Sequence, residues 1–173
     1  MGMSKKAMIL WCIWIGLLDG IYCWVCTGLP NAGFMWVAFV SLPIFFCGGA
    51  EYKTFPTYFC SATSGVLWGL LSLWALGLTG IADPGINMLV TLTPIVAILC
   101  IVHMVWFPNT VLGHAPMVFG GFASCFGTGG QNSVWVIITL ALGLVLGVLI
   151  TEGGKIITKV VDKPAADEPT VTT

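Results

Sequence analysis

The stretch VWVIITLALGLVLGVLIT, residues 134–151, is uninterrupted by any charged side chain. An α-helix rises about 1.5 Å per residue and the hydrocarbon core of a bilayer is about 30 Å thick, so roughly 20 apolar residues cross it. The stretch ends at Glu152, where the chain becomes polar. It therefore predicts a membrane-spanning helix, and runs of similar character elsewhere are candidates for further spans.

The composition of the whole chain agrees with this prediction. Of 173 residues, 58% are hydrophobic and 8% are charged, and the mean hydropathy is +1.01. Soluble domains carry about 25% charged residues, so most of the surface of a soluble protein built from this chain would be apolar. The composition excludes a soluble enzyme, a disordered chain and a nucleic-acid-binding protein of the basic-patch type. An integral membrane protein is predicted, with the lipid bilayer as its surroundings.

Five further apolar runs are separated by Pro, Gly, Asn and the few charged residues, at 7–29, 33–47, 57–78, 86–107 and 111–126. Strands of a membrane β-barrel would be shorter and would alternate apolar with polar residues, which these runs do not. The predicted fold class is all-α, a polytopic membrane protein with six transmembrane helices. Residues 1–155 form the predicted membrane domain, with halves at about 7–78 and 86–151, and residues 156–173 form a polar tail.

The lysines predict the orientation. With six spans, both termini and the second and fourth loops share one side of the membrane. All six lysines fall on that side, and none falls in the other three loops: Lys5, Lys6, Lys53, Lys155, Lys159 and Lys163. Lysine and arginine are enriched in cytoplasmic loops. Both termini and the polar tail are therefore predicted to be cytoplasmic.

The two halves show a weak internal similarity. When Cys47 is aligned with Cys125, four further identities follow: Gly49 with Gly127, Gly65 with Gly143, Gly69 with Gly147, and Leu71 with Leu149. In a chain with 22 glycines, such identities also arise from composition alone. A real repeat of three helices would place the halves in opposite orientations, as in many channels and transporters. Four glycines are predicted to end or break the middle helices, Gly48, Gly49, Gly127 and Gly129, and four to pack helices together, Gly65, Gly69, Gly143 and Gly147.

Four strings carry a resemblance to a known family: FFCGG at 45–49, SGVLWG at 64–69, FPNTVLG at 107–113, and Ala141-Leu142-Gly143-x-x-x-Gly147. Over about residues 8–151 the chain resembles domain-of-unknown-function family 1097, which consists of small bacterial inner-membrane proteins. The resemblance implies a six-helix protein in the bacterial inner membrane. It implies no settled activity and supplies no catalytic residues.

Asp19 is the only acidic residue deep inside a predicted span. An ionised carboxylate at mid-bilayer costs at least about 2.5–3.5 kcal/mol on insertion scales, so it is expected to face a partner, a cavity or water. Asp19 belongs to a stripe of small or polar residues along one helix face: Cys12, Gly16, Asp19, Cys23 and Cys26. The opposite face, with Trp14, Leu17, Ile21 and Val25, is expected to meet lipid or aromatic side chains. Two interpretations remain, a group lining a pathway and a hydrogen-bonded carboxyl that joins two helices.

Histidine and phenylalanine give two further hypotheses. His103 is the only histidine inside a predicted span, and it either takes part in proton movement or makes an interhelical hydrogen bond. Phenylalanines cluster on the middle helices of both halves, where they either form a constriction that repels hydrated ions or pack against lipid. The residues predicted to line a pathway are Asp19, Cys23, Phe45, Phe46, His103, Phe122 and Phe126.

The predicted function is a channel-like or secondary-transport facilitator for a small neutral or weak-acid metabolite, working as a homo-oligomer. The alternative is a non-transporting scaffold or sensor subunit that binds a partner protein through its helix seams. No nucleophile–base pair, HExxH motif or paired acids is present, so an intramembrane enzyme is not expected. No cofactor is expected, and His103 with His114 lacks the further ligands of a metal site.

Overall fold

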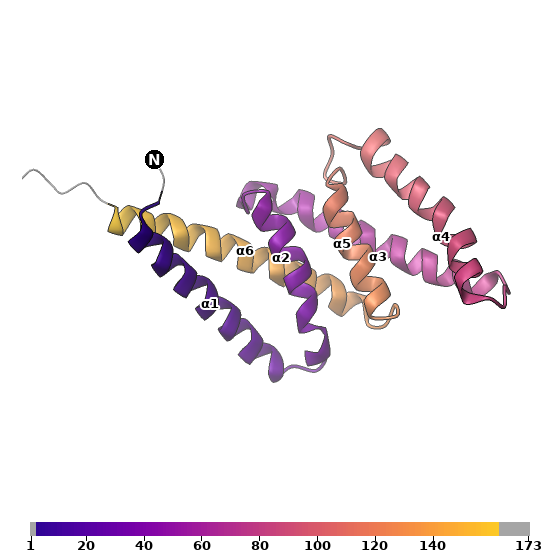
Figure 1. The fold of residues 1–173 in the computed structure, drawn as a ribbon, viewed down its shortest axis with the longest axis horizontal. Coiled ribbons are helices and arrows are strands. Elements are labelled where there is room, and N and C mark those ends of the chain that lie inside the picture. The colour runs from indigo at the N-terminus through magenta and orange to yellow at the C-terminus, as the bar shows by residue number, and fades with distance from the viewer. Residues whose placement is uncertain (1–2, 163–173) are drawn as a thin grey trace, which may run out of the picture.

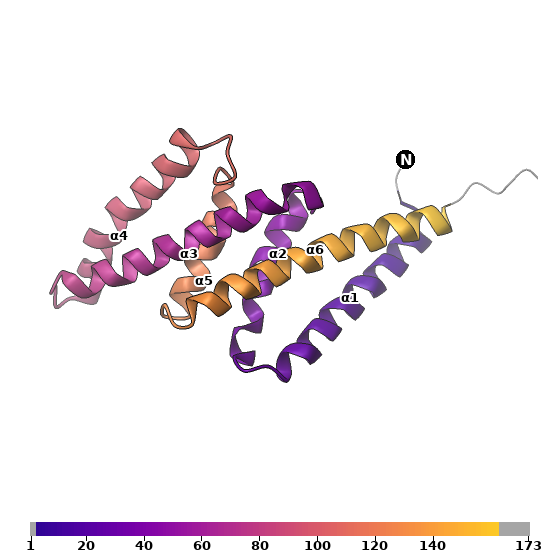
Figure 2. The same ribbon diagram turned by 180° about the vertical axis from the view of Figure 1, so that it is seen from behind.

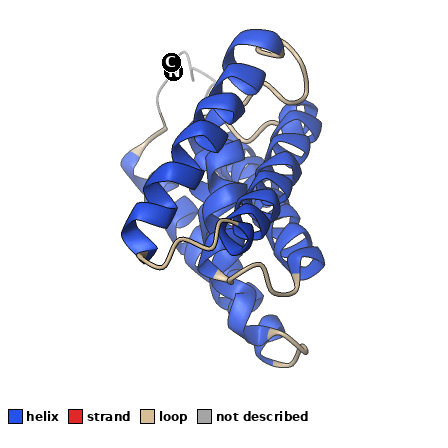
Figure 3. Cartoon of the chain, turned by 90° about the vertical axis from the view of Figure 1, so that its right-hand side faces the viewer, coloured by secondary structure: helices blue, strands red, loops and turns tan. Residues whose placement is uncertain are grey.

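The computed structural model describes residues 3–162, which form helices and connecting loops without a strand (Figure 3). The prediction of an all-helical fold is confirmed for this part of the chain. The six α-helices are α1 (Lys5–Thr27), α2 (Ala38–Cys47), α3 (Phe55–Leu78), α4 (Pro84–Cys100), α5 (Ala115–Gly127) and α6 (Ser133–Val161). Short 3-10 turns precede α2 (Ala32–Val37) and α3 (Tyr52–Thr54), and a π-helical segment continues α4 (Ile101–Trp106).

The six helices are not of equal length, although the sequence predicted that each of them spans the membrane. Four are long and apolar enough to cross a membrane: Lys5–Thr27, Tyr52–Leu78, Pro84–Trp106 and Ser133–Val161. The other two, Ala32–Cys47 and Ala115–Gly127, are shorter than the roughly 20 residues that cross a bilayer. Six apolar helices fit a membrane protein, with the second and fifth too short to cross it alone. The last helix is longer than predicted, because α6 continues past Thr151 to Val161; residues 163–173 of the predicted tail lie outside the described residues.

The two long helices α3 and α6 lie side by side and run in opposite directions, with α2 and α5 on one side of them (Figure 2). The outer helices α1 and α4 lie at opposite ends of the molecule (Figure 1). Helix α1 packs on α6, and α4 packs on α3. The first helix of each half therefore contacts the last helix of the other half, so the two halves are interlocked.

The core lies where α2, α3, α5 and α6 meet. Its centre is Phe45 of α2, which is fully buried and whose ring lies 4.7 Å from the ring of Tyr58 in an edge-on contact. Other fully buried side chains around it are Val66, Met117, Cys125, Val136 and Leu144. By contrast, α1 and α4 with its π-helical extension expose large apolar side chains, as expected for helices that face lipid: Ile9, Ile13, Trp24, Leu89, Val105 and Trp106.

Glycines allow the helices of this core to touch backbone to backbone. A Cβ atom at Gly65 would lie 1.9 Å from the carbonyl oxygen of Val118, and one at Gly143 would lie 2.3 Å from that of Ala38. A Cβ atom at Gly69 would lie 2.6 Å from the Cβ of Cys125, and one at Gly147 would lie 2.9 Å from Cδ1 of Phe45. Inside a membrane the hydrophobic effect does not hold helices together, and close packing at small residues stabilises their contacts instead. The four predicted packing glycines thus lie at the α3–α5 and α2–α6 contacts.

Two tryptophans of α1 hydrogen-bond to the backbone of α6. The indole nitrogen Nε1 of Trp11 donates to the carbonyl of Ile150 at 2.9 Å, and that of Trp14 donates to the carbonyl of Leu149 at 3.2 Å. Gly153 and Gly154 make room for the indoles, because a Cβ at either position would lie under 3.0 Å from an indole nitrogen. Trp14 therefore contacts the backbone of α6, whereas the sequence pattern placed it on the face of α1 expected to meet lipid or aromatic side chains.

The turns that follow α2 and α5 have the same hydrogen-bond pattern. After α2, the N–H of Gly49 donates to the carbonyl of Phe46, and that of Ala50 donates to Phe45. After α5, the N–H of Gly129 donates to Phe126, and that of Gly130 donates to Cys125. Gly49 and Gly129 both have a positive φ, 90° and 62°, as the residue after the C-cap of such a turn requires. The helix breaks thus fall at Gly48–Gly49 and at 128–129, and Gly127 is the last residue of α5.

Candidate functional site

Asp19 shares a face of α1 with residues that lie against α2. Ile15 and Tyr22, one turn before and one turn after it on the same face of α1, both contact α2 or line the space beside it. The ring of Tyr22 lies 5.7 Å from that of Phe39, and its hydroxyl donates to the carbonyl of Met35 at 2.9 Å. The oxygen Oδ1 of Asp19 is buried and has no hydrogen-bond partner among the described residues. One oxygen of this carboxyl group is therefore buried without a polar contact, on the face of α1 that carries Ile15 and Tyr22.

A hollow of about 310 Å³ lies between α1, α2 and α6. Its walls are apolar: Ile15, Phe39, Leu42, Pro43, Phe46 and Ile150. Cys23, one turn beyond Asp19 on α1, is half-buried, whereas Gly16 and Cys12 on the same predicted stripe are exposed. The part of the stripe from Asp19 to Cys26 is thus the part that turns toward the protein.

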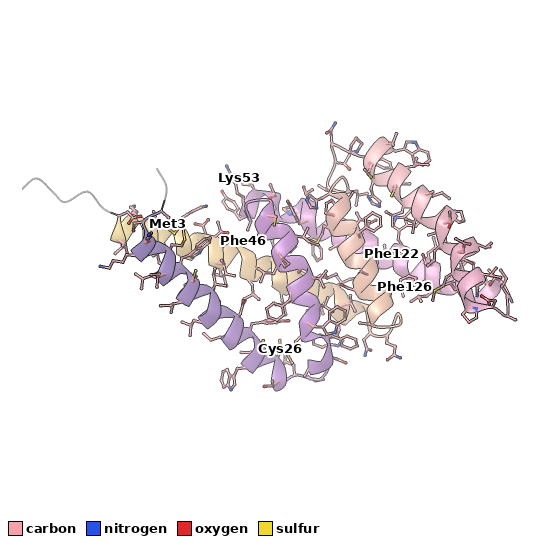
Figure 4. The ribbon with its side chains drawn as sticks, in the orientation of Figure 1. Met3, Cys26, Phe46, Lys53, Phe122 and Phe126 are labelled. Atoms are coloured by element: carbon pink, nitrogen blue, oxygen red, sulfur yellow. The ribbon has the colours of Figure 1, made fainter. Side chains whose placement is uncertain are left out.

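The four phenylalanines predicted to line a pathway lie in three places (Figure 4). Phe45 is buried in the core, and Phe46 faces α1, where its ring stacks on Trp11 at 5.6 Å. Phe122 and Phe126 stack on each other at 4.8 Å on α5. They do not meet Phe46 at one constriction, because α2 and α5 turn these rings toward different neighbours.

His103 is fully buried in the π-helical segment after α4 and joins it to α3. The indole N–H of Trp68 donates to its Nε2 at 3.1 Å, and Ser64 Oγ also lies 3.1 Å from that nitrogen. An indole nitrogen can only donate, so Nε2 is an acceptor, and the proton lies on Nδ1, which donates to the carbonyl of Leu112 at 2.7 Å. Both ring nitrogens of His103 are thus engaged in contacts, and those to Trp68 and Ser64 join the π-helical segment to α3.

The structure separates the residues predicted to line one pathway into two groups. Cys23 and Phe46 pack in the cluster between α1, α2 and α6, and Asp19 lies one turn before Cys23 on α1. His103, Phe122 and Phe126 lie on the α4 and α5 side of the molecule. The tryptophan hydrogen bonds onto α6 were not predicted; the Gly153-Gly154 pair beside a predicted span was their only sequence signal. Among residues 3–162, no group of three or more His, Cys, Asp or Glu side chains could hold a metal ion.

Residues 12–155 match the model of a family described as a protein of unknown function, DUF1097. The chain belongs to this family. No curated protein and no solved structure matches it. The resemblance in the sequence strings is therefore confirmed, and the function of this DUF1097 protein has to be inferred from its own residues.

One histidine of this DUF1097 protein lies outside the four membrane-length helices, at the start of α5. His114 is the N-cap of the helix, and its Nδ1 accepts a hydrogen bond from the backbone N–H of Met117 at 3.2 Å. Its own backbone N–H donates to Ser61 Oγ at 3.3 Å, and its ring lies 4.0 Å from that of Tyr58. Burial lowers the pKa of this imidazole below its ordinary value of 6.5. The neutral form is the one that caps the helix.

This cap predicts a stability that depends on pH. Because the pKa of His114 is lower in the folded state, its contribution is complete above pH 6.5 and is lost as the pH falls through the folded-state pKa. Asparagine is a good N-cap that does not titrate. The His114→Asn variant should therefore lose less unfolding free energy than wild type as the pH is lowered from neutral to mildly acidic, measured by SDS titration in detergent micelles. Equal losses in both proteins would contradict the assignment, and His114→Ala should cost about 1 kcal/mol at neutral pH.

Proposed function

We propose that this DUF1097 protein is a channel-like or secondary-transport facilitator for a small neutral or weak-acid metabolite in the bacterial inner membrane, and not an enzyme. The observation that carries the proposal is the pair of short helices α2 and α5, each packed into the core and ended by the same turn. Paired short or broken helices in corresponding places of two halves are the features that most often mark a pathway in transporters.

We further propose that the two halves are inverted repeats. The spans Lys5–Thr27 and Pro84–Trp106 both have 23 residues. Helix α3 begins at Phe55 and α6 begins at Ser133, which is the same offset that aligns Gly65 with Gly143.

The contacts of the two short helices correspond as well, once the turn at Gly49 is aligned with the turn at Gly129. In this alignment Ser41 of α2 corresponds to Gly121 of α5. Gly121 lies against the carbonyl of Ala62 on α3, and the hydroxyl of Ser41 donates to the carbonyl of Leu140 on α6 at 2.7 Å. Each short helix therefore uses the same position to approach the backbone of a long one.

The proposed orientation places both termini and Lys53 in the cytoplasm. Met3 and Lys53 lie at one edge of the helix layer and Cys26 lies at the opposite edge (Figure 4). At that opposite edge the loop after α1 meets the loop after α5, because Asn132 Nδ2 donates to Asn31 Oδ1 at 3.3 Å. Lysines lie at the edge of Met3 and Lys53, the lysine edge, and are absent from these two loops. This distribution supports the assignment of the lysine edge to the cytoplasm.

Asp19 is the proposed polar group of the pathway. A carboxyl group in this position is costly in a bilayer and is expected where a solute or proton needs it. Val40 and Ile44 of α2 lie against Gly120 of α5, and the fully buried Phe45 and Met117 of these two helices belong to one core cluster. Passage between these helices therefore requires a second conformation in which they separate, which is the motion that alternating access uses.

The test is solute flux into proteoliposomes. Wild type is expected to move at least one solute from a panel of small neutral and weak-acid compounds faster than empty liposomes, with saturation. Asp19→Asn should reduce this flux about tenfold or more, roughly the effect of losing one polar contact worth ~1.4 kcal/mol. Asp83→Asn is the matched control, because it removes the same charge from the N-cap of α4 with a residue that caps equally well.

Phe46→Ala and Phe126→Ala test whether the rings on corresponding positions of α2 and α5 limit passage. A change in selectivity among the solutes is expected in both. The absence of any solute-specific flux above empty liposomes would contradict the proposal. If a single partner protein then co-purified in fixed stoichiometry, the scaffold function would be favoured instead.

A further inference from the structure

A second hollow lies at the lysine edge of the molecule, where the end of α6 meets the start of α1. It has a volume of about 540 Å³ and is lined by Met3, Trp11, Phe46, Gly49, Thr151, Gly154, Lys155, Thr158 and Lys159. Its floor is the stacked pair of Trp11 and Phe46. Its rim carries two hydroxyl groups and two ammonium groups, all from one face of the last turns of α6. The hollow is therefore apolar at its base and cationic at its mouth.

This hollow is continuous in its lining with the apolar hollow between α1, α2 and α6. Phe46 lines both, and the residues next to it, Trp11 in one and Ile15 in the other, are one turn apart on α1. Ile150 and Thr151 are likewise adjacent on α6. A molecule lying along this path would contact lysine and threonine at the membrane edge and only apolar side chains deeper in.

Charge at this end of the molecule is predominantly positive. Lys5 and Lys6 begin α1, and a hydrogen bond from the Ser4 backbone N–H to Asp162 Oδ2, 3.0 Å long, holds this end of α1 beside the end of α6. Lys155 forms an ion pair with Glu152, with 2.7 Å between Nζ and Oε1, and both side chains remain about half exposed. Within residues 3–162, the acidic groups near this end are Glu51, Glu152 and Asp162, against four lysines.

The corresponding end of α3 lacks these charges. With Gly65 aligned on Gly143, Lys155 and Lys159 correspond to Gly77 and Ile81. With the starts of α1 and α4 aligned, Trp11 corresponds to Val90. In the described part of the chain, the cationic hollow is therefore not repeated in the other half, and it lies at the edge proposed to be cytoplasmic.

We propose that these two hollows form one binding site for an anionic phospholipid of the cytoplasmic leaflet. Its phosphate lies between Lys155 and Lys159 and accepts a hydrogen bond from Thr151, since the hydroxyl of Thr158 donates to the carbonyl of Gly154. One acyl chain passes over Phe46 into the apolar hollow beside Pro43 and Ile150. Basic pockets between helices on the cytoplasmic side are the places where anionic headgroups bind membrane proteins. The proposal does not depend on transport, since it needs only that the helices lie in a bilayer.

The test is lipid-dependent stabilisation of the purified full chain in detergent micelles. Phosphatidylglycerol is expected to raise the unfolding temperature at lower concentration than phosphatidylcholine with the same acyl chains. Removing one lysine near a membrane surface weakens anionic-lipid binding about fivefold, so Lys155→Gln with Lys159→Gln should raise the half-maximal phosphatidylglycerol concentration about 25-fold. Lys53→Gln, on the same edge but outside both hollows, is the matched control and should leave this concentration unchanged.

A second variant tests the acyl-chain part of the site. Ile15→Trp places a larger side chain in the apolar hollow and should weaken stabilisation by both lipids while leaving the preference for phosphatidylglycerol intact. Inorganic phosphate alone should give no stabilisation, because it lacks the acyl chain. The proposal is overturned if the double lysine variant keeps the wild-type phosphatidylglycerol dependence, if Lys53→Gln loses as much, or if phosphate alone stabilises the protein equally.

Discussion

Replacing Gly65 by alanine is expected to lower the free energy of unfolding by about 2–3 kcal/mol. The added Cβ would lie 1.9 Å from the carbonyl oxygen of Val118 and 2.9 Å from the backbone nitrogen of Phe122. Both atoms belong to the backbone of α5, so no side-chain rotation relieves the contact. The helices α3 and α5 would have to separate, and the contact of Gly121 with Ala62 on the same seam would be lost with them.

Gly77→Ala is the matched control on the same helix. A Cβ at Gly77 meets no atom within 4 Å, and alanine stabilises an exposed helix position by up to about 1 kcal/mol relative to glycine. SDS titration in detergent micelles, followed by circular dichroism, should therefore show Gly65→Ala well below wild type and Gly77→Ala at or above it. Equal stability of the two variants would show that the α3–α5 contact does not carry the fold.

The helices could be predicted from the sequence because apolar run length is a direct physical requirement of a bilayer. The predicted spans 7–29 and 57–78 differ from α1 and α3 by at most two residues at either end. The end of α6 was predicted too early, at Thr151, because the criterion was loss of hydrophobicity. The helix continues because its last turns pack against α1, where Gly153 and Gly154 receive Trp14 and Trp11.

The alignment of the two halves by residue identity matches the starts of α3 and α6, but it does not match the turns after α2 and α5. The alignment that relates Gly65 to Gly143 also pairs Gly49 with Gly127, whereas the turn at Gly49 corresponds to that at Gly129. The difference arises because the connection before α3 contains the additional 3-10 turn Tyr52–Thr54. Alignment by identical residues paired Gly49 with Gly127, but the positive φ that defines the turn is at Gly129.

The candidate site could be predicted only in part. The helical period correctly placed Asp19 and Cys23 on one face, but the period alone does not say which face another helix covers. The covered face of α1 is set by contacts with residues far away in the sequence, such as that of Trp11 with Ile150. Similarly, the hydrogen-bond partners of the buried His103, Trp68 and Leu112, come from two other segments. A single histidine in an apolar run does not predict which residues these are.

The proposed inverted orientation of the two halves predicts an all-or-none difference between two exposed residues. Glu51 and Gln131 occupy the same place after the two matching turns, and both are exposed. In two parallel halves these residues would face the same side of the membrane. In two inverted halves they face opposite sides, with Glu51 beside the lysine edge and Gln131 next to Asn132, which contacts Asn31 at the other edge.

Labelling of single introduced cysteines in intact cells measures this directly. A membrane-impermeant maleimide should react with Gln131→Cys above the background of the parent chain, and with Glu51→Cys only after the membrane is opened. The native cysteines are the same in both variants, so the parent chain supplies the background for each. Labelling of Gln131→Cys alone from outside is the result that two inverted halves predict. Labelling of both positions from the same side would contradict the inverted architecture and, with it, the proposed pathway between α2 and α5.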